Sequence, residues 1–248
     1  MIILKTNDEI ARMREANLIL AHLFEHLRPM VQPGITTAEL DYEAEIFIRS
    51  HNAVPAFKGY RGFPSTLCTS VNEEVVHGIP GSRKLCSGDI VSIDVGALLE
   101  GFYSDAARTY PVGNISKQAQ KLMDATENAL AAGINQAYPG NRLSDISCAV
   151  QQVVESAGFN VVRDFVGHGI GKGLHEDPQI PNFGKKGNGI MLKEGMTIAI
   201  EPMVNLGSWK VVILADGWTA VSSDGSLSAH FENSIAITKD GPLILSAL

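Results

Sequence analysis

The sequence predicts an α+β fold in which a strongly curved antiparallel sheet is covered by helices. A helix–break–helix pattern occurs twice, with Pro-Gly breaks at residues 33–34 and 139–140. Each pattern is followed by an apolar strand that begins with Gly and carries a carboxylate six residues later, Asp94 in one case and Glu201 in the other. A His-Gly-Ile tripeptide also occurs once in each half. These matches, in the same order, indicate two related halves that face one another.

The halves span roughly residues 1–113 and 114–248, and only a short connection at 114–115 joins them. We therefore expect a single domain over residues 1–248. Two facing halves would bring their equivalent strand ends, and so Asp94 and Glu201, close to a shared centre.

Composition bounds the class of protein. The chain has 248 residues, 45% of them apolar, so a sizeable core is available. Its net charge of −7 argues against nucleic-acid binding through phosphate neutralisation. No apolar run is long enough for a membrane span, and charged residues follow the first four residues too soon for a signal peptide. The three widely spaced cysteines fit reduced thiols, so we expect a cytoplasmic protein.

The first elements of both halves read as helices. Capping-box patterns at 6–9 and 36–39 precede residues with apolar helical spacing, which predicts a helix on each side of the first Pro-Gly break. In the second half a helix is expected to begin near Ser116, and another to run from about 144 to 157.

Two acids lie in a predicted hairpin of the first half. Residues 90–95 read as a strand and 103–110 as its return, which places Asp94 and Asp105 on one face. With a turn centred on residues 99–100, the two carboxylates would lie directly opposite one another and repel. Two interpretations remain open at this point: a protonated acid or one paired with Arg108, or a divalent metal shared by both carboxylates.

Two further acids favour the interpretation that the site binds a divalent metal. Glu201 ends an apolar strand of the second half, and Glu232 lies in the predicted strand 228–238, on the same face as His230. Four acids within apolar strands are difficult to explain as a solvated surface. Oxygen-rich coordination with one histidine suits Mn, Fe(II) or Co, and shared carboxylates suggest two metals about 3.5–4 Å apart bridged by water or hydroxide.

The candidate histidine ligand comes from the segment 167–175, which has Gly at every second position between 167 and 173. A phosphate-binding loop is an alternative there, but it requires a helix to follow, and the sequence after His175 begins one poorly. An extended segment that presents His168 and His175 to one cavity fits better. His77 is supported only by its match to His168 in the repeat.

In this order and context, the candidate ligands resemble those of the methionine aminopeptidases. The most specific matching motifs are SVNEEVVHGIP, GDIVSID, FYSD, GHGIG and DGWTA, at residues 70–80, 88–94, 102–105, 167–171 and 216–220. The resemblance covers the whole chain and implies the pita-bread fold with pseudo-twofold halves, in the compact type I form of bacteria. It also implies one catalytic metallopeptidase domain over residues 1–248.

The resemblance implies a role for each ligand. Asp94 would chelate one metal ion, and Asp105 and Glu232 would bridge both. His168 and Glu201 would bind the second ion. The ions would be Co, Mn, Fe(II) or Zn, and a bridging water or hydroxide would attack the peptide bond.

It also implies how substrate is held. Glu201 would relay the proton of the attacking water, His77 would hydrogen-bond the scissile amide region, and His175 would hydrogen-bond the substrate carbonyl. The methionine pocket would be lined by Tyr60, Phe63, Cys68 and Trp218.

The implied activity is removal of the initiator methionine from nascent proteins whose second residue is small. The implied enzyme is cytoplasmic and monomeric, with transient ribosome association and without nucleic-acid specificity or membrane attachment. Three positions depart from the common pattern of the family: Phe57 replaces Cys, Phe63 replaces Tyr, and His230 replaces Gln.

Three alternatives compete with this interpretation. A proline-specific relative, such as a prolidase, has the same ligands but usually an additional N-terminal domain. A non-catalytic relative would have lost ligands, whereas all five positions hold competent residues. A structural calcium site is disfavoured by the histidine ligand.

Overall fold

The computed structural model describes residues 2–248. Four long helices are present in these residues: α1 (Asn7–Leu27), α2 (Thr37–Ser50), α3 (Lys117–Ile134) and α4 (Leu143–Ser156). Two short 3-10 helices are η1 (Arg28–Met30) and η2 (Tyr60–Gly62). None of the helices in residues 2–248 is both long and apolar enough to cross a membrane.

A nine-stranded sheet takes strands from both predicted halves. Its order is β1-β4-β5-β14-β9-β7-β8, with β2 paired to β4 and β15 paired to β14, and each of these pairs is antiparallel. The strands are β1 (Val54–Pro55), β2 (Leu67–Val71), β4 (Ile90–Leu99), β5 (Phe102–Pro111), β7 (Gly167–Gly169), β8 (Glu176–Ile180), β9 (Thr197–Ile200), β14 (Glu232–Thr238) and β15 (Gly241–Ile244). The halves are joined where β5 pairs with β14.

Two three-stranded sheets complete the fold, in the orders β13-β10-β6 and β11-β12-β3. Their strands are β3 (Glu74–Val76), β6 (Asn160–Val161), β10 (Met203–Asn205), β11 (Val211–Ile213), β12 (Ala220–Ser222) and β13 (Ser228–His230).

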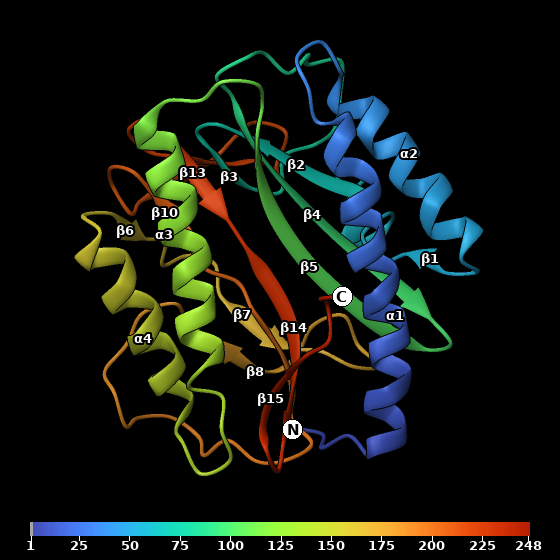
Figure 1. Cartoon of the computed structure of the whole chain (residues 1–248), viewed down its shortest axis with the longest axis vertical. Helices are drawn as coiled ribbons and strands as arrows, with labels where there is room; N and C mark the ends of the chain where they lie inside the picture. Colours follow the sequence, from blue (N-terminus) through green and yellow to red (C-terminus); the bar gives the residue numbers. More distant parts are fainter. Residues whose placement is uncertain (1) are drawn as a thin grey trace.

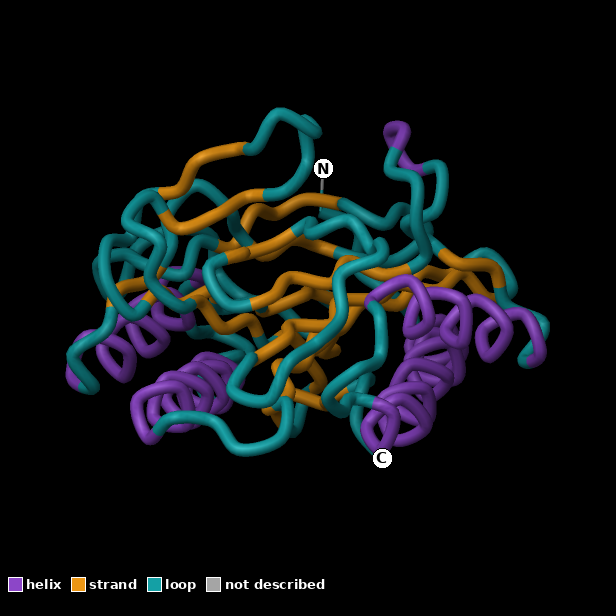
Figure 2. Tube along the Cα trace, turned by 90° about the horizontal axis from the view of Figure 1, so that it is seen from above, coloured by secondary structure: helices purple, strands orange, loops and turns teal. Residues whose placement is uncertain are grey.

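The helices lie in two pairs against one face of the strands. Figure 1 shows α1 and α2 on one side and α3 and α4 on the other, with β5 and β14 between them. Figure 2 shows the strands as a curved layer and the long helices gathered beneath it. Each pair buries its own core, which includes Leu20, Leu40 and Val91 in one half and Leu122, Ile146 and Ile200 in the other. The opposite face of the sheet is therefore left for the site.

The predicted helix starts are confirmed. Thr6 and Glu9 form a reciprocal capping box at α1, and Thr36 and Glu39 form another at α2. The Ser116 side chain accepts a hydrogen bond from the Ala119 amide at the start of α3. The fourth helix begins and ends within one residue of the predicted bounds.

The predicted turn of the β4–β5 hairpin is displaced by one residue. Leu99 pairs with Phe102, and the turn consists of Glu100 and Gly101, whose φ values are 48° and 83°. Two consecutive residues with positive φ match the twist of a two-residue hairpin turn. A turn at residues 99–100 would have required positive φ at Leu99 instead. Consequently Asp94 pairs with Ala107 and Asp105 pairs with Gly96. The two acids share a face, as predicted, but lie diagonally rather than directly opposite.

The strand predicted over 228–238 is interrupted at Phe231. Its first part, β13, pairs with β10 in a small sheet, whereas β14 enters the large sheet between β5 and β9. This change of partners brings His230 and Glu232 to the junction of the two sheets, and it is a long-range effect that local alternation does not encode.

Candidate metal centre and adjoining pocket

The five candidate ligands converge on one point from both halves. Asp94 and Asp105 come from β4 and β5, His168 from β7 and Glu232 from β14, and Glu201 directly follows β9. His168 Nε2 lies 3.7 Å from Asp105 Oδ2 and 3.7 Å from Glu201 Oε1. One ligand atom each from Asp105, His168 and Glu232 fits within a span of 4.8 Å. The structure therefore brings together residues that are distant in sequence.

Neighbouring groups orient these side chains. Nδ1 of His168 lies 2.9 Å from the carbonyl oxygen of Gly169, so the other ring nitrogen, Nε2, faces the acids. The Ser234 hydroxyl donates to the carbonyl of Asp105 at 2.7 Å, and the Asn182 amide donates to the carbonyl of Glu201 at 3.0 Å. The first bond ties β14 to β5, and the second holds the backbone of Glu201 just after β9.

Glycines around His168 allow strands to approach closely. A Cβ atom at Gly167 would lie 2.3 Å from the carbonyl oxygen of Ala199, and one at Gly169 would lie 2.1 Å from that of Asp177. The alternating glycines therefore serve strand packing. The phosphate-loop alternative is wrong, because β8 rather than a helix follows this segment.

Burial makes ionisation of the four acids unfavourable. Burial raises the pKa of Asp94 to about 7 and holds the pKa values of Asp105, Glu201 and Glu232 well above their ordinary range. For Asp105, Glu201 and Glu232, repulsion from neighbouring carboxylates adds to this effect. Burial lowers the pKa of His168, which favours its neutral form.

Arg108 is not the ion-pair partner of these acids, so that alternative is wrong. It pairs with Ile93 in the hairpin and therefore lies on the face opposite Asp94. Its guanidinium lies over the ring of Phe24 and donates to the carbonyl of Glu232 at 2.5 Å and to Asn233 Oδ1 at 2.7 Å. It supports the backbone of β14 and forms no ion pair with Asp94 or Asp105, although its charge partly offsets the raised pKa of Glu232.

The donor set fits a divalent cation. Asp94 Oδ1, Asp105 Oδ1 and Glu232 Oε1 are buried and lack a hydrogen-bond partner within residues 2–248. Buried oxygens without partners are costly unless a cation or a proton satisfies them. Several carboxylate oxygens with one neutral imidazole are ligands that hard or borderline divalent ions prefer.

A cavity of about 130 Å³ opens beside Asp94. The four predicted pocket residues, Tyr60, Phe63, Cys68 and Trp218, all line it, together with His77 and His175. Its remaining lining residues are Phe57, Arg61 and Leu174. The sequence did not predict Arg61 and Leu174 as pocket residues. The only feature of the sequence that points to them is that they adjoin Tyr60 and His175.

The two predicted substrate histidines border this cavity. His175 Nδ1 is 2.9 Å from the Tyr60 hydroxyl, and the two rings stack with centroids 5.2 Å apart. The ring of His77 meets Trp218 edge-on, with centroids 6.4 Å apart. Burial lowers the pKa of His77 and lowers that of His175 to about 4, so both are neutral at pH 7.

A wider cavity of about 620 Å³ lies between α1 and α3 and includes Arg108 and Glu127 in its lining. None of the candidate ligands or pocket residues borders it. The smaller cavity is the one associated with the acids.

Comparisons with known proteins agree with this geometry. Residues 11–239 match the model of metallopeptidase family M24. The methionine aminopeptidase of Clostridium perfringens is 58% identical over the full length of both chains, and methionine aminopeptidase 1 of Bacillus subtilis is 56% identical over 99% of both. The crystal structure of the methionine aminopeptidase of Thermotoga maritima covers 100% of both chains at 48% identity with a TM-score of 0.98.

The prolidase of Pyrococcus furiosus shares the fold alone, at 23% identity and a TM-score of 0.79 over 99% of this chain and 66% of its own. These likenesses confirm the predicted α+β pita-bread fold. The protein is therefore a hydrolase and a member of metallopeptidase family M24.

Proposed function

We propose that this protein hydrolyses the N-terminal initiator methionine from nascent proteins whose second residue is small. The observation that carries the proposal is the buried cluster of four acids and His168 beside a mostly apolar cavity of about 130 Å³. Relatives that are 50–58% identical over nearly the whole chain are methionine aminopeptidases, which supports the same activity.

The proposed metal ligands are Asp94, Asp105, His168, Glu201 and Glu232. Asp94 would hold one ion, Asp105 and Glu232 both, and His168 and Glu201 the other. Two divalent ions there, Co, Mn, Fe(II) or Zn, would lower the pKa of water and polarise the substrate carbonyl.

Glu201, His77 and His175 would also act on the substrate. The Glu201 carboxylate would accept the proton of the attacking water and pass it to the leaving amine. His77 would hydrogen-bond the scissile amide. The Tyr60 hydroxyl, by donating to His175 Nδ1, would keep the proton of the neutral imidazole on Nε2, which would then donate to the substrate carbonyl.

The wider context of the activity is also proposed. Residues 1–248 would act as one catalytic domain, because both halves contribute ligands to the centre. The enzyme would be monomeric and cytoplasmic. Its partners would be emerging polypeptides that begin with methionine, met during transient ribosome association. Neither nucleic-acid specificity nor membrane attachment is needed for that role.

A peptide assay tests the activity. Chelator-stripped protein is expected to release methionine from Met-Ala-Ser only after Mn, Fe(II), Co or Zn is added, and to leave an Ala-Pro peptide uncleaved. Cleavage of the Ala-Pro peptide alone would favour a proline-specific enzyme. Failure with every metal on both peptides, in folded protein that binds metal, would favour a non-catalytic role.

The pocket assignment predicts a selective effect of Trp218→Ala. Loss of the indole wall removes apolar contact with the methionine side chain, worth roughly 1.5–3 kcal/mol for full burial. We expect kcat/KM for Met-Ala-Ser to fall about 10–100-fold, with metal affinity unchanged.

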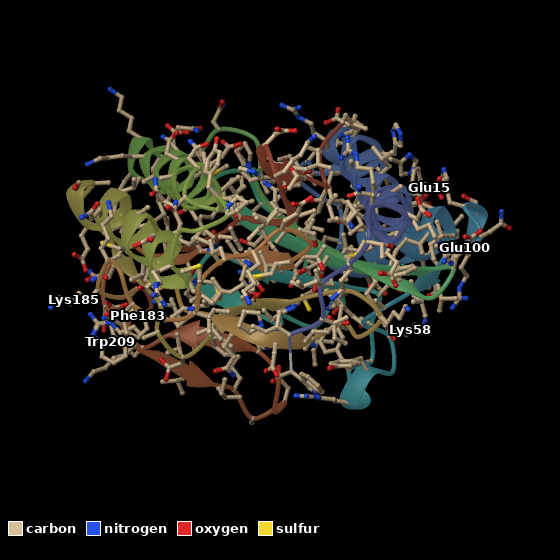
Figure 3. All side chains as sticks on the ribbon, turned by 90° about the horizontal axis from the view of Figure 1, so that it is seen from below. Glu15, Lys58, Glu100, Phe183, Lys185 and Trp209 are labelled. Atoms are coloured by element: carbon tan, nitrogen blue, oxygen red, sulfur yellow. The ribbon has the colours of Figure 1, made fainter. Side chains whose placement is uncertain are left out.

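Trp209→Ala is the matched control, because Trp209 packs on Arg163 away from the pocket. Figure 3 shows Trp209 at the margin of the molecule near Phe183 and Lys185, with Lys58 and Glu100 at the opposite margin. Equal losses in both tryptophan variants would contradict the assignment.

A further inference from the structure

His230 is a buried imidazole beside the candidate metal centre to which the proposed mechanism gives no task. Its side chain is 2% exposed, and its Nε2 has no hydrogen-bond partner in the described part of the chain. Nε2 lies 4.0 Å from Glu201 Oε2. A buried polar atom without a partner is unfavourable, so this atom requires a function or a ligand.

The backbone of His230 is held firmly in place. Its amide donates to the Thr109 hydroxyl at 3.0 Å, and that hydroxyl lies 2.7 Å from its carbonyl. His230 also pairs with Met203 across β13 and β10. Because Thr109 belongs to β5 and Met203 in β10 lies two residues after Glu201, the backbone that carries the imidazole is fixed beside the centre.

The carboxylate of Glu201 lies between two imidazoles that meet different oxygens. Oε1 is 3.7 Å from His168 Nε2, on the side of the other acids, whereas Oε2 is 4.0 Å from His230 Nε2. The second distance is about 1 Å longer than a hydrogen bond, and a small rotation of the glutamate side chain closes it. Carboxylates that bind metals are commonly oriented in this way by a donor to their other oxygen.

We propose that His230 is a positioning residue for Glu201: its Nε2–H donates to Oε2 and so holds the carboxylate with Oε1 directed at the metal centre. This inference rests on the proposed function, because it assigns Glu201 a task at that centre.

Two substitutions of nearly equal size distinguish the effect of the N–H donor of His230 from the effect of its packing. His230→Gln retains an N–H donor at the end of the side chain, whereas His230→Met fills the space without one. For each we would measure thermal unfolding, the affinity for Co(II) by calorimetry, the visible absorption of bound Co(II), and kcat and KM for Met-Ala-Ser.

His230→Met is expected to fold, to bind Co(II) about 10–100-fold more weakly, and to lose kcat by a similar factor with little change in KM. His230→Gln is expected to retain most of the wild-type affinity for Co(II) and most of the wild-type kcat. Wild-type behaviour of His230→Met would overturn the inference. Equal impairment of both variants, with altered Co(II) absorption, would also overturn it by showing that the imidazole is itself a ligand. Absence of methionine release from metal-loaded wild-type protein would instead refute the proposed function.

Discussion

Asp105→Asn is expected to lower kcat/KM for Met-Ala-Ser by about 1,000-fold or more, whichever divalent metal is supplied. Asp105 is 4% exposed, and its carboxylate lies within the 4.8 Å cluster with His168 and Glu232. An amide removes the charge and one ligand oxygen while it retains the shape. Metal ions contribute several kcal/mol to stabilising the transition state, and each 1.36 kcal/mol is a factor of ten in rate.

The same variant separates function from folding. Because Asp105 is repelled by Asp94 and Glu201, its replacement is expected to leave the melting temperature of metal-free protein unchanged or higher. The rise in melting temperature on adding Mn should be lost. The exposed Asp240→Asn is the matched control and should behave as wild type. Near-normal turnover by Asp105→Asn would contradict the assignment of a metal-bridging carboxylate.

Local patterns predict much of this fold because they encode local interactions. The capping boxes at Thr6 and Thr36 fix helix starts within a few residues, and the hairpin follows from two adjacent apolar segments. The displaced hairpin turn depends on the left-handed conformations of Glu100 and Gly101. The interruption at Phe231 depends on which strands lie nearby, and single-sequence alternation carries no information about that.

The candidate site was predictable to a similar extent. Acids within apolar strands are conspicuous because burial opposes their charge, which is why Asp94 and Glu201 could be identified from the sequence. The pocket residues followed only from the family resemblance, since Cys68 and Phe63 look like ordinary core residues. The contact between His230 and Glu201 joins separate strands across two sheets, so it became visible only in three dimensions.

Metal-free protein is expected to lose stability as the pH rises from 6.5 to 8. In this window the unfolded chain has ionised carboxylates, whereas burial gives Asp94 a pKa of about 7 and holds the pKa values of Asp105, Glu201 and Glu232 well above their ordinary range. The unfolded state therefore binds fewer protons than the folded state, and the free energy of unfolding falls with increasing pH.

The buried histidines act in the opposite sense but at lower pH. Burial lowers the pKa of His175 to about 4 and that of His230 to about 3, and it also lowers the pKa values of His77 and His168. Histidines of the unfolded chain titrate near pH 6.5, so the unfolded chain binds more protons at these positions until they are neutral, at about pH 7.5. The histidines therefore reduce the decline between pH 6.5 and 7.5, and the decline between pH 7.5 and 8 reports mainly the carboxyl groups.

Urea unfolding in the presence of a chelator, at intervals across this range, measures the decline. Asp94→Asn should reduce the slope, because it removes one of the groups that the folded protein keeps protonated. Saturating Mn should remove most of the slope, since bound metal requires ionised ligands, and calorimetry in two buffers of different ionisation enthalpy should detect the protons released. A constant or rising free energy of unfolding from pH 7.5 to 8, where the histidines contribute little, without proton release on metal binding, would mean that the four acids are already ionised and neutralised by protein groups. The case for a metal centre would then lose its electrostatic basis, because buried carboxylates that are already satisfied have no need of a cation.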